Sequence, residues 1–209
     1  MTYSSSLADE SRSLVLDASV LINLHASNYG ERILTAIPND IVVPKIVAGE
    51  LEHETSRKNG EHNFLYDLII RGKVTIADMT DEEFDLFADL TSGSPSLDDG
   101  EAATIAIAAN RKLLPIIDEK KDRTRASNLM AGQQPDWSLD LLRHPIVLHI
   151  LEDAHANDAL YLALRDGRMR VPAEFSEYAV DLIGIERALD CSCLPNFKRL
   201  VRKGSIQSG

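Results

Sequence analysis

The stretch that decides the fold reads LVLDASVLINL at residues 14–24. Its first three residues are apolar and end abruptly at Asp17, which is typical of a short buried β-strand. After Ser19 the apolar residues recur at helical spacing, so a helix is predicted to follow the strand directly. The stretch therefore predicts one strand-to-helix unit of an α/β domain, with an acid at the junction.

The same alternation of strand and helix continues along the chain to about residue 130. Further strands are predicted at residues 40–43, 73–77 and 113–117. Helices are predicted at residues 19–36 (interrupted at 28–30), 45–56, 63–70, 81–90, 99–109 and 121–130. Strands that alternate with helices are typical of an α/β domain with a central, mostly parallel sheet.

Two segments flank this α/β domain, which we place at residues 13–150. Residues 1–12 are polar and are predicted to be flexible. Beyond Ser138 the pattern is helical to about Leu189, so residues 151–209 are predicted to form a helical C-terminal extension. This extension ends in a basic tail that contains Lys198, Arg199, Arg202 and Lys203.

The composition is that of an ordinary soluble globular protein, with 44% hydrophobic and 26% charged residues among 209. The chain has two cysteines, Cys191 and Cys193, which cannot build a disulfide framework or a four-cysteine zinc site. It shows no signal peptide, and no apolar run approaches the roughly 18 residues that a membrane helix needs. We therefore expect a cytoplasmic protein without a membrane partner.

The net charge is -11, from 22 basic and 33 acidic residues. An acidic surface repels polyanions, so the overall charge alone argues against binding to nucleic acid. Two features weaken that argument. A carboxylate-rich metal site adds negative charge that its metal neutralises, and the basic residues are clustered. One cluster contains Arg111, Lys112, Lys120, Lys121, Arg123 and Arg125.

Two of the predicted strands end on an aspartate, at Asp17 and at Asp118. In a parallel sheet the carboxyl ends of the strands meet at the edge where ligands bind. We therefore expect these two carboxylates to stand on the same edge of the sheet, although they are far apart in the sequence.

Two glutamates on predicted helices complete the group of acids. Glu50 lies beside the apolar stripe formed by Val47 and Leu51, and Glu101 opens a helix rich in small residues. A carboxylate that faces a core is costly unless it is paired or bound to a metal. Four carboxylates without a neighbouring His or Cys ligand suit Mg²⁺ or Mn²⁺ better than Zn²⁺. Such a site predicts metal-assisted hydrolysis of a phosphodiester.

Each of these acids also has a purely structural explanation. Asp17 is placed to cap the helix that follows it, Glu50 to stand on the surface, and Glu101 suits the start of a helix on electrostatic grounds alone. Neighbouring acids compete for the third and fourth positions, and the choice among them stays open. These competing acids are Asp98, Asp99, Glu119 and Asp122.

Four short motifs resemble the PIN-domain family and stand in the order in which that family carries them. They are LDASVLINL at residues 16–24, Val43-Pro44 followed by Glu50, GEA at residues 100–102 with Ile-Ala repeats, and IIDE at residues 116–119 followed by Arg123. The likeness covers about residues 14–130 and points to the toxin-type (VapC-like) PIN ribonucleases and related uncharacterised PIN proteins. It implies a three-layer α/β/α fold with a central, mostly parallel sheet, here followed by a C-terminal helical extension.

The resemblance also implies the chemistry. PIN domains are metal-dependent nucleases that typically act on RNA, so it implies an endoribonuclease that uses Mg²⁺ or Mn²⁺. The family's catalytic, metal-binding acids carry over to Asp17, Glu50, Glu101 and Asp118. Supporting roles fall to Ser19 and Asn23 near the first acid, and to Asp98 and Glu119. In the family at large the third acid is more often an aspartate.

Lys120, Lys121 and Arg123 follow Asp118 closely in the sequence. They are expected either to contact RNA phosphates or to form an ordinary solvated helix face.

Three functions are to be distinguished. The first is RNA cleavage by the toxin of a toxin–antitoxin pair, with an antitoxin as partner and the homodimer that the family commonly forms. The second is a PIN-fold module that binds RNA or protein and has lost its activity. The third is an α/β phosphoacceptor domain built on Asp17 and Asp118, which the position of Glu50 fits poorly.

Overall fold

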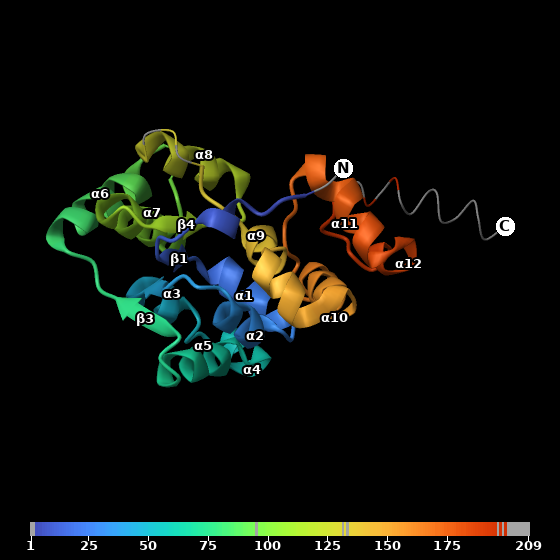
Figure 1. Ribbon diagram of the computed structural model, residues 1–209. Helices are drawn as coiled ribbons and strands as arrows, with labels where there is room; N and C mark the ends of the chain where they lie inside the picture. Colours follow the sequence, from blue (N-terminus) through green and yellow to red (C-terminus); the bar gives the residue numbers. More distant parts are fainter. Residues whose placement is uncertain are drawn as a thin grey trace.

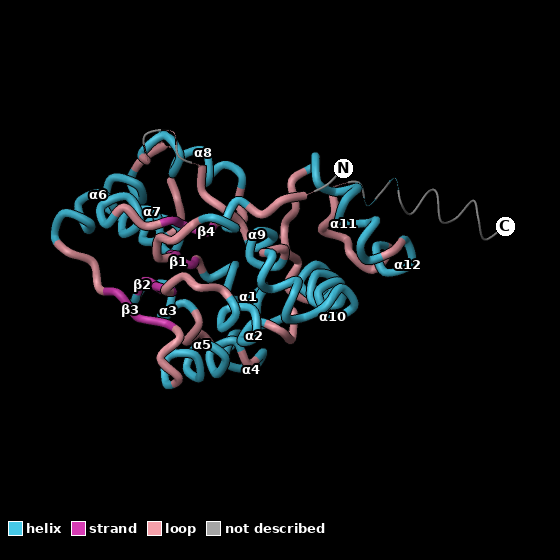
Figure 2. Tube along the Cα trace, viewed as in Figure 1, coloured by secondary structure: helices cyan, strands magenta, loops and turns pink. Residues whose placement is uncertain are grey.

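The computed structural model describes residues 3–94, 96–130, 132, 134–195, 197 and 199. Its centre is a four-stranded sheet in which every strand pairing is parallel, in the order β3-β2-β1-β4 (Figure 2). The strands are β1 (Leu14–Leu16), β2 (Ile41–Pro44), β3 (Val74–Ala77) and β4 (Leu114–Ile116). The predicted parallel sheet is therefore confirmed, and the four predicted strands are its members.

Helices cover both faces of the sheet, which confirms the predicted three-layer α/β/α fold (Figure 1). One face carries α6 (Asp81–Ser92), α7 (Asp99–Arg111) and α8 (Lys120–Leu129). The other face carries α1 (Ala18–Ala26), α2 (Gly30–Ala36), α5 (Glu61–Ile70) and α9 (Ser138–Leu142). Two short helices, α3 (Lys45–Glu50) and α4 (Glu54–Asn59), follow β2.

Strand β1 shows why the sequence folds this way. All three of its residues are fully buried, so it reads as a continuous apolar run rather than as an alternating one. Leu14 and Leu16 belong to the core that contains α1, whereas Val15 packs on the opposite face with Ile107 and Ala108 of α7. One short strand thus joins two cores, as a central strand of a three-layer fold must.

Helix α7 packs against β1, β2 and β4. Its residues from Gly100 to Ala108 are all buried, and most of them are small. Small side chains let the helix approach the sheet closely, as its alanine-rich sequence predicted. The helix begins at Asp98, whose carboxylate accepts a hydrogen bond from the Glu101 amide at 2.9 Å.

The predicted helix at residues 45–56 is in fact two helices. The first, α3, ends at Glu50, and α4 begins after His53. Gly49 disfavours a helix interior by about 1 kcal/mol relative to alanine, and Leu51 turns into the core, where it is 1% exposed. The predicted capping box before α6 is confirmed: Thr80 and Glu83 exchange backbone–side-chain hydrogen bonds of 3.3 and 2.9 Å.

The C-terminal helices lie together on one side of the molecule (Figure 1). They are α10 (Pro145–Arg165), the 3₁₀ turn η2 (Ala173–Phe175), α11 (Ser176–Ile183) and α12 (Ile185–Ala188). Helix α10 runs through the predicted domain boundary at residue 150, and its buried side chains share a core with β1 and α1. The division into 13–150 and 151–209 stays a prediction, and the side chains of α10 pack continuously across the predicted boundary.

The N-terminal segment, predicted to be flexible, is held against the body from Tyr3 onward. The Tyr3 hydroxyl donates to Asp140 at 2.6 Å, and Leu7, in the 3₁₀ turn η1 (Ser6–Asp9), is 1% exposed. A single buried leucine in a polar stretch was too weak a signal to predict this anchoring.

Of the predicted basic tail, Lys198, Arg202 and Lys203 lie outside the described residues. Arg199 is described, and its guanidinium pairs with Glu177 at 2.9 Å. None of the described helices is both long and apolar enough to cross a membrane.

Enlarging Ala108 tests the close packing of α7 on the sheet. Ala108 is fully buried beside Val15 and Ala77, so Ala108→Leu should lower the free energy of unfolding by about 1–3 kcal/mol through overpacking. Ala88→Leu makes the same change at an exposed position of α6 and should leave the free energy of unfolding nearly unchanged. Urea denaturation followed by circular dichroism measures both, and equal effects would contradict the packing described here.

Candidate active site

The first and fourth predicted acids leave the same edge of the sheet. In the parallel pairing of β1 with β4, Leu16 lies opposite Ile116, so Asp17 and Asp118 both follow the carboxyl ends of neighbouring strands. Both are buried, with exposed fractions of 6% and 8%. The predicted placement of these two carboxylates is what the structure shows.

Asp17 is both a helix cap and a buried acid. Its carboxylate accepts hydrogen bonds from the Ser19 amide at 3.3 Å and from the Ser19 hydroxyl at 2.6 Å. It thereby starts α1, as the structural explanation required. Ser19 therefore contacts the first predicted acid, and its supporting role stays a prediction. Capping uses one carboxylate oxygen, Oδ2, so it does not exclude a second role.

Glu50 reaches the N-terminus of α7 from the end of α3. Its carboxylate lies directly over Gly100: a Cβ on that glycine would be 2.6 Å from Glu50 Oε1 and 3.0 Å from Oε2. Only glycine allows such a close approach. The GEA motif therefore has a physical explanation, because the glycine makes room for the acid of another helix.

Glu101 stands in the first turn of α7 and is 9% exposed. Its Oε2 atom is buried without a hydrogen-bond partner among the described residues. Asp98, predicted as a supporting residue, is the exposed cap of the same helix and holds the Glu101 backbone rather than its carboxylate.

Asp118 is held by more donors than the other acids. It accepts from the Asn23 amide at 2.6 Å, and from the backbone N–H and hydroxyl of Ser138 at 2.8 and 2.6 Å. Asn23 was expected beside the first acid, so its placement at Asp118 is a correction. Ser138 was missed, because nothing in the sequence relates the start of α9 to the end of β4.

A cavity of about 180 Å³ opens between Glu101 and Asp118. From the α/β part of the chain it is lined by Ser19, Ile22, Asn23, Glu101, Asp118 and Glu119. The loop after α10 forms the rest of its wall with Gly167, Arg168 and Arg170. Two of the four predicted acids and three of the predicted supporting residues therefore share one cavity.

Burial and mutual repulsion raise the pKa values of these carboxyl groups. Burial is the largest cause for Asp17, whose pKa rises to about 6, and for Glu50, whose pKa rises to about 7. The charge of Asp17 is the next cause for Glu50. Burial, followed by the carboxyl group of Asp122, raises the pKa of Glu101 to about 9. Asp17 is thus close enough to oppose the ionisation of both Glu50 and Glu101.

Comparison with known families identifies the domain that carries these acids. A family model described as a PIN domain matches residues 13–132, from the approach to β1 to the end of α8. The chain belongs to the PIN-domain family. PIN domains are generally nucleases, so the fold is of nuclease type. No curated protein and no solved structure was found to match the chain.

Asp122, on α8, is a further buried carboxylate beside Glu101. It is 0% exposed, and neither of its oxygens has a hydrogen-bond partner among the described residues. Its nearest cation is the Lys121 ammonium at 3.9 Å from Oδ1. From the sequence it is expected only as a competitor of Asp118 for the fourth position. The signal for its burial was its spacing of four residues from Ala126, which is also buried on α8.

The donor set of this site suits a hard divalent cation. Its atoms are carboxylate oxygens, and three of them, on Glu101 and Asp122, are buried without a donor. Within the part of the chain that is described, however, no group of three or more His, Cys, Asp or Glu side chains is arranged to hold a metal ion. The residues present therefore fit Mg²⁺ or Mn²⁺ in chemistry, while their side chains do not form a closed set of ligands.

The predicted nucleic-acid contacts divide into two kinds. Lys120 and Lys121 are exposed at the start of α8. Arg123 instead lies over the ring of Trp137, 3.7 Å from its centroid, and donates to the Pro135 carbonyl oxygen at 2.9 Å. Its guanidinium does not line the acid cavity. The other predicted supporting residue, Glu119, forms an ion pair with Arg170.

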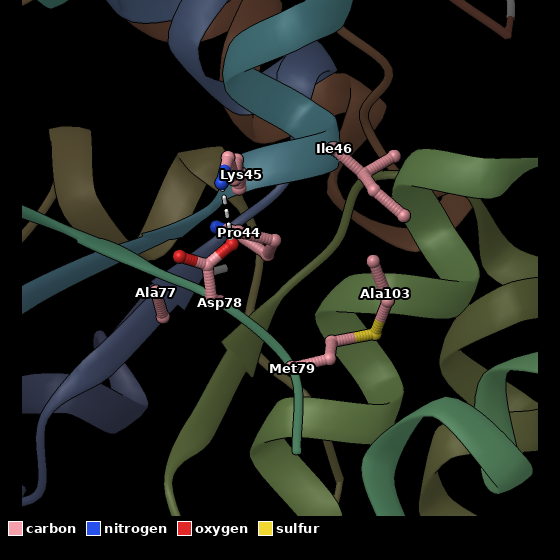
Figure 3. Close-up of a pocket in the computed structure, with 7 residues that line it drawn as sticks. All are labelled: Pro44, Lys45, Ile46, Ala77, Asp78, Met79 and Ala103. Atoms are coloured by element: carbon pink, nitrogen blue, oxygen red, sulfur yellow. Dashed lines mark ion pairs between the residues drawn. The ribbon is translucent and has the colours of Figure 1, made fainter. Parts of the chain in front are cut away.

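A smaller cavity of about 150 Å³ continues along the same sheet edge, beyond β2 and β3 (Figure 3). Met79 extends toward Ala103 on α7, and the Lys45 ammonium pairs with Asp78 at 2.9 Å across the mouth. Its acid is paired and its remaining walls are largely apolar, so it adds no candidate catalytic group.

Gly100→Ala should displace Glu50 without unfolding the protein. The three atoms nearest to the added Cβ all belong to the end of the flexible Glu50 side chain, so Glu50 moves while α7, which gains a better helix former, stays intact. We expect Mn²⁺ to raise the melting temperature of the variant less than that of the wild type. Gly49→Ala, where nothing lies within 4 Å, is the matched control and should respond to Mn²⁺ like the wild type.

The metal-free protein should lose stability as the pH rises from about 5 to about 8. The folded pKa of Glu101, about 9, exceeds its ordinary value of 4.5, so the folded chain keeps a proton that the unfolded chain releases. Such a group lowers the free energy of unfolding by up to about 1.4 kcal/mol per pH unit. Glu101→Gln should flatten this dependence, and exposed Glu186→Gln should not. Parallel slopes for all three proteins would contradict the shift.

Proposed function

We propose that this PIN-domain protein is an endoribonuclease that depends on Mg²⁺ or Mn²⁺. The observation that carries the proposal is the convergence of Asp17, Glu50 and Glu101 at one sheet edge, where Glu50 lies against the first turn of α7 and where burial and neighbouring carboxylates raise the pKa values of all three. Buried carboxylates that repel one another are costly to keep without a cation. Burying these carboxylates destabilises the metal-free fold, so their arrangement supports a metal-dependent reaction.

The chain's own residues would divide the work. Asp17, Glu50, Glu101 and Asp118 are the proposed ligands, with Asp122 behind Glu101. The ion would supply a nucleophilic water at neutral pH and offset the charge at phosphorus. Ser19 fixes the carboxylate of Asp17, and Asn23 fixes that of Asp118. The cavity between Glu101 and Asp118 leaves room for the scissile phosphate.

The resemblance to toxin-type PIN ribonucleases extends the proposal to its biological setting. We propose a toxin-like role in the cytoplasm, with RNA as substrate, an antitoxin protein as partner and a homodimer as the assembled form. The exposed Lys120 and Lys121, next to Asp118, support contact with a polyanion, either RNA or an acidic segment of an antitoxin.

A catalytically silent module that binds RNA or protein is the alternative. Two observations favour it: the Asp118 carboxylate is fully engaged by Asn23 and Ser138, and the described residues form no ready group of metal ligands. In that case the acids would be remnants of a site. Metal binding distinguishes the two functions, because a silent module need not bind Mn²⁺.

Cleavage of a mixed RNA pool with Mg²⁺ or Mn²⁺ tests the proposal. The wild type should cleave, and Asp17→Asn should lower the rate at least about 100-fold, since loss of a ligand costs no less than loss of its supporting partner. Asp67→Asn, an exposed acid on α5, is the matched control and should cleave normally. Calorimetric titration with Mn²⁺ should show weaker binding to Asp17→Asn alone.

Failure of clean wild-type protein to cleave RNA or to bind Mn²⁺ would favour the silent module. Cleavage that survives Asp17→Asn would place the reaction outside this group of acids.

A further inference from the structure

The loop between α10 and η2, residues 166–172, reaches the acid cavity from outside the PIN domain. Gly167, Arg168 and Arg170 line the same cavity as Glu101 and Asp118. The family match ends at residue 132, so this part of the wall belongs to the C-terminal extension. The extension therefore does more than pack against the α/β part: it completes the site.

Three contacts hold the loop at the cavity. Gly167 lies against Asn23 so closely that a Cβ would be 2.7 Å from its Oδ1 atom. Met169 is 1% exposed, and its N–H donates to the Ala163 carbonyl at 3.0 Å. Arg170 forms an ion pair with Glu119, which follows the fourth acid. Arg168 therefore stands in a segment that is anchored on both sides.

The backbone at Arg168 is left-handed, with a φ of 58°. This conformation costs a residue with a Cβ about 1–2 kcal/mol, so the surrounding contacts impose it. The side chain is exposed and borders the cavity. Among the described residues, no hydrogen bond or ion pair engages its guanidinium, in contrast to Arg170; its positive charge partly offsets the burial that raises the pKa of the Cys193 thiol.

An RNA phosphate needs a cation at this place. The chain carries a net charge of -11, and the cavity is lined by carboxylates, so an approaching phosphate meets repulsion. Arg123, the one arginine among the predicted contacts, faces Trp137 and Pro135 instead. An exposed guanidinium without an ion pair suits a phosphate oxygen better than a lysine ammonium does, because it donates in a planar fork.

We propose that Arg168 binds a backbone phosphate of the single-stranded RNA substrate and so positions the chain over the acids, while Arg170 fixes the loop through Glu119. The proposal rests on the ribonuclease function proposed above. It assigns to the C-terminal extension a direct contact with substrate, one that the PIN domain alone lacks.

Binding of RNA at several salt concentrations tests the contact. The probe is a fluorescein-labelled, mixed-sequence single-stranded RNA, followed by anisotropy with Ca²⁺ in place of Mg²⁺, and a gel confirms that it stays intact. Arg168→Gln should weaken binding about tenfold, as expected for one lost hydrogen bond to a charged group. It should also reduce the slope of log affinity against log salt by about 0.7, the value for one released phosphate contact.

Two variants make the test specific. Lys73→Gln removes an exposed cation just before β3, at the opposite edge of the parallel sheet, and should leave both affinity and slope unchanged. Arg168→Lys keeps the charge and should retain the slope while losing part of the affinity. If Arg168 only stabilised the loop, Arg168→Lys would not retain the salt dependence of the wild type while losing affinity.

The outcomes distinguish this contact from the function on which it rests. If wild-type protein cleaves RNA and Arg168→Gln binds it with unchanged affinity and slope, the contact is refuted and the ribonuclease function stands. If Arg168→Gln and Lys73→Gln weaken binding equally, the effect is one of net charge and the contact is likewise refuted. If the wild type neither binds nor cleaves RNA, both proposals fall.

Discussion

The parallel pairing of β1 with its two neighbours is the constraint on which the rest of the structure depends. Because β2, β1 and β4 run in one direction, their carboxyl ends meet at one edge, and every chain segment that leaves them starts there. Asp17 follows β1 directly, Asp118 comes two residues after the end of β4, and α3 carries Glu50 away from β2. The buried apolar run of β1, only three residues long, thereby determines where the acids gather.

That gathering places like charges in a region from which water is largely removed, and the surrounding residues moderate the cost unequally. Asp118 has three donors from Asn23 and Ser138, whereas the buried oxygens of Asp122 have none. The acids therefore differ in how far they are satisfied by the protein itself. A cation would satisfy the carboxylate oxygens that have no donor in the protein. The donor chemistry of these acids and their raised pKa values therefore support the same proposal.

Local patterns were sufficient for the four strands and for most of the helices, and they led to the predicted acids. Asp17 and Asp118 were found because they end apolar runs, and Glu101 because it opens an alanine-rich helix. What the sequence did not reveal depends on packing between distant segments. The partnership of Ser138 with Asp118, the burial of Asp122 and the approach of Gly167 to Asn23 arise only when α8, α9 and α10 have taken their places.

Helix α10 has a consequence for how the chain folds. Its residues, such as Leu160 and Leu164, are buried in the same core as Leu14, Leu16 and α1. A segment limited to the family match would leave that side of β1's core uncovered and present a continuous apolar surface to water. The segment that matches the family model and the packed core are therefore different lengths of chain, because the core of this PIN domain includes α10, which lies beyond the match.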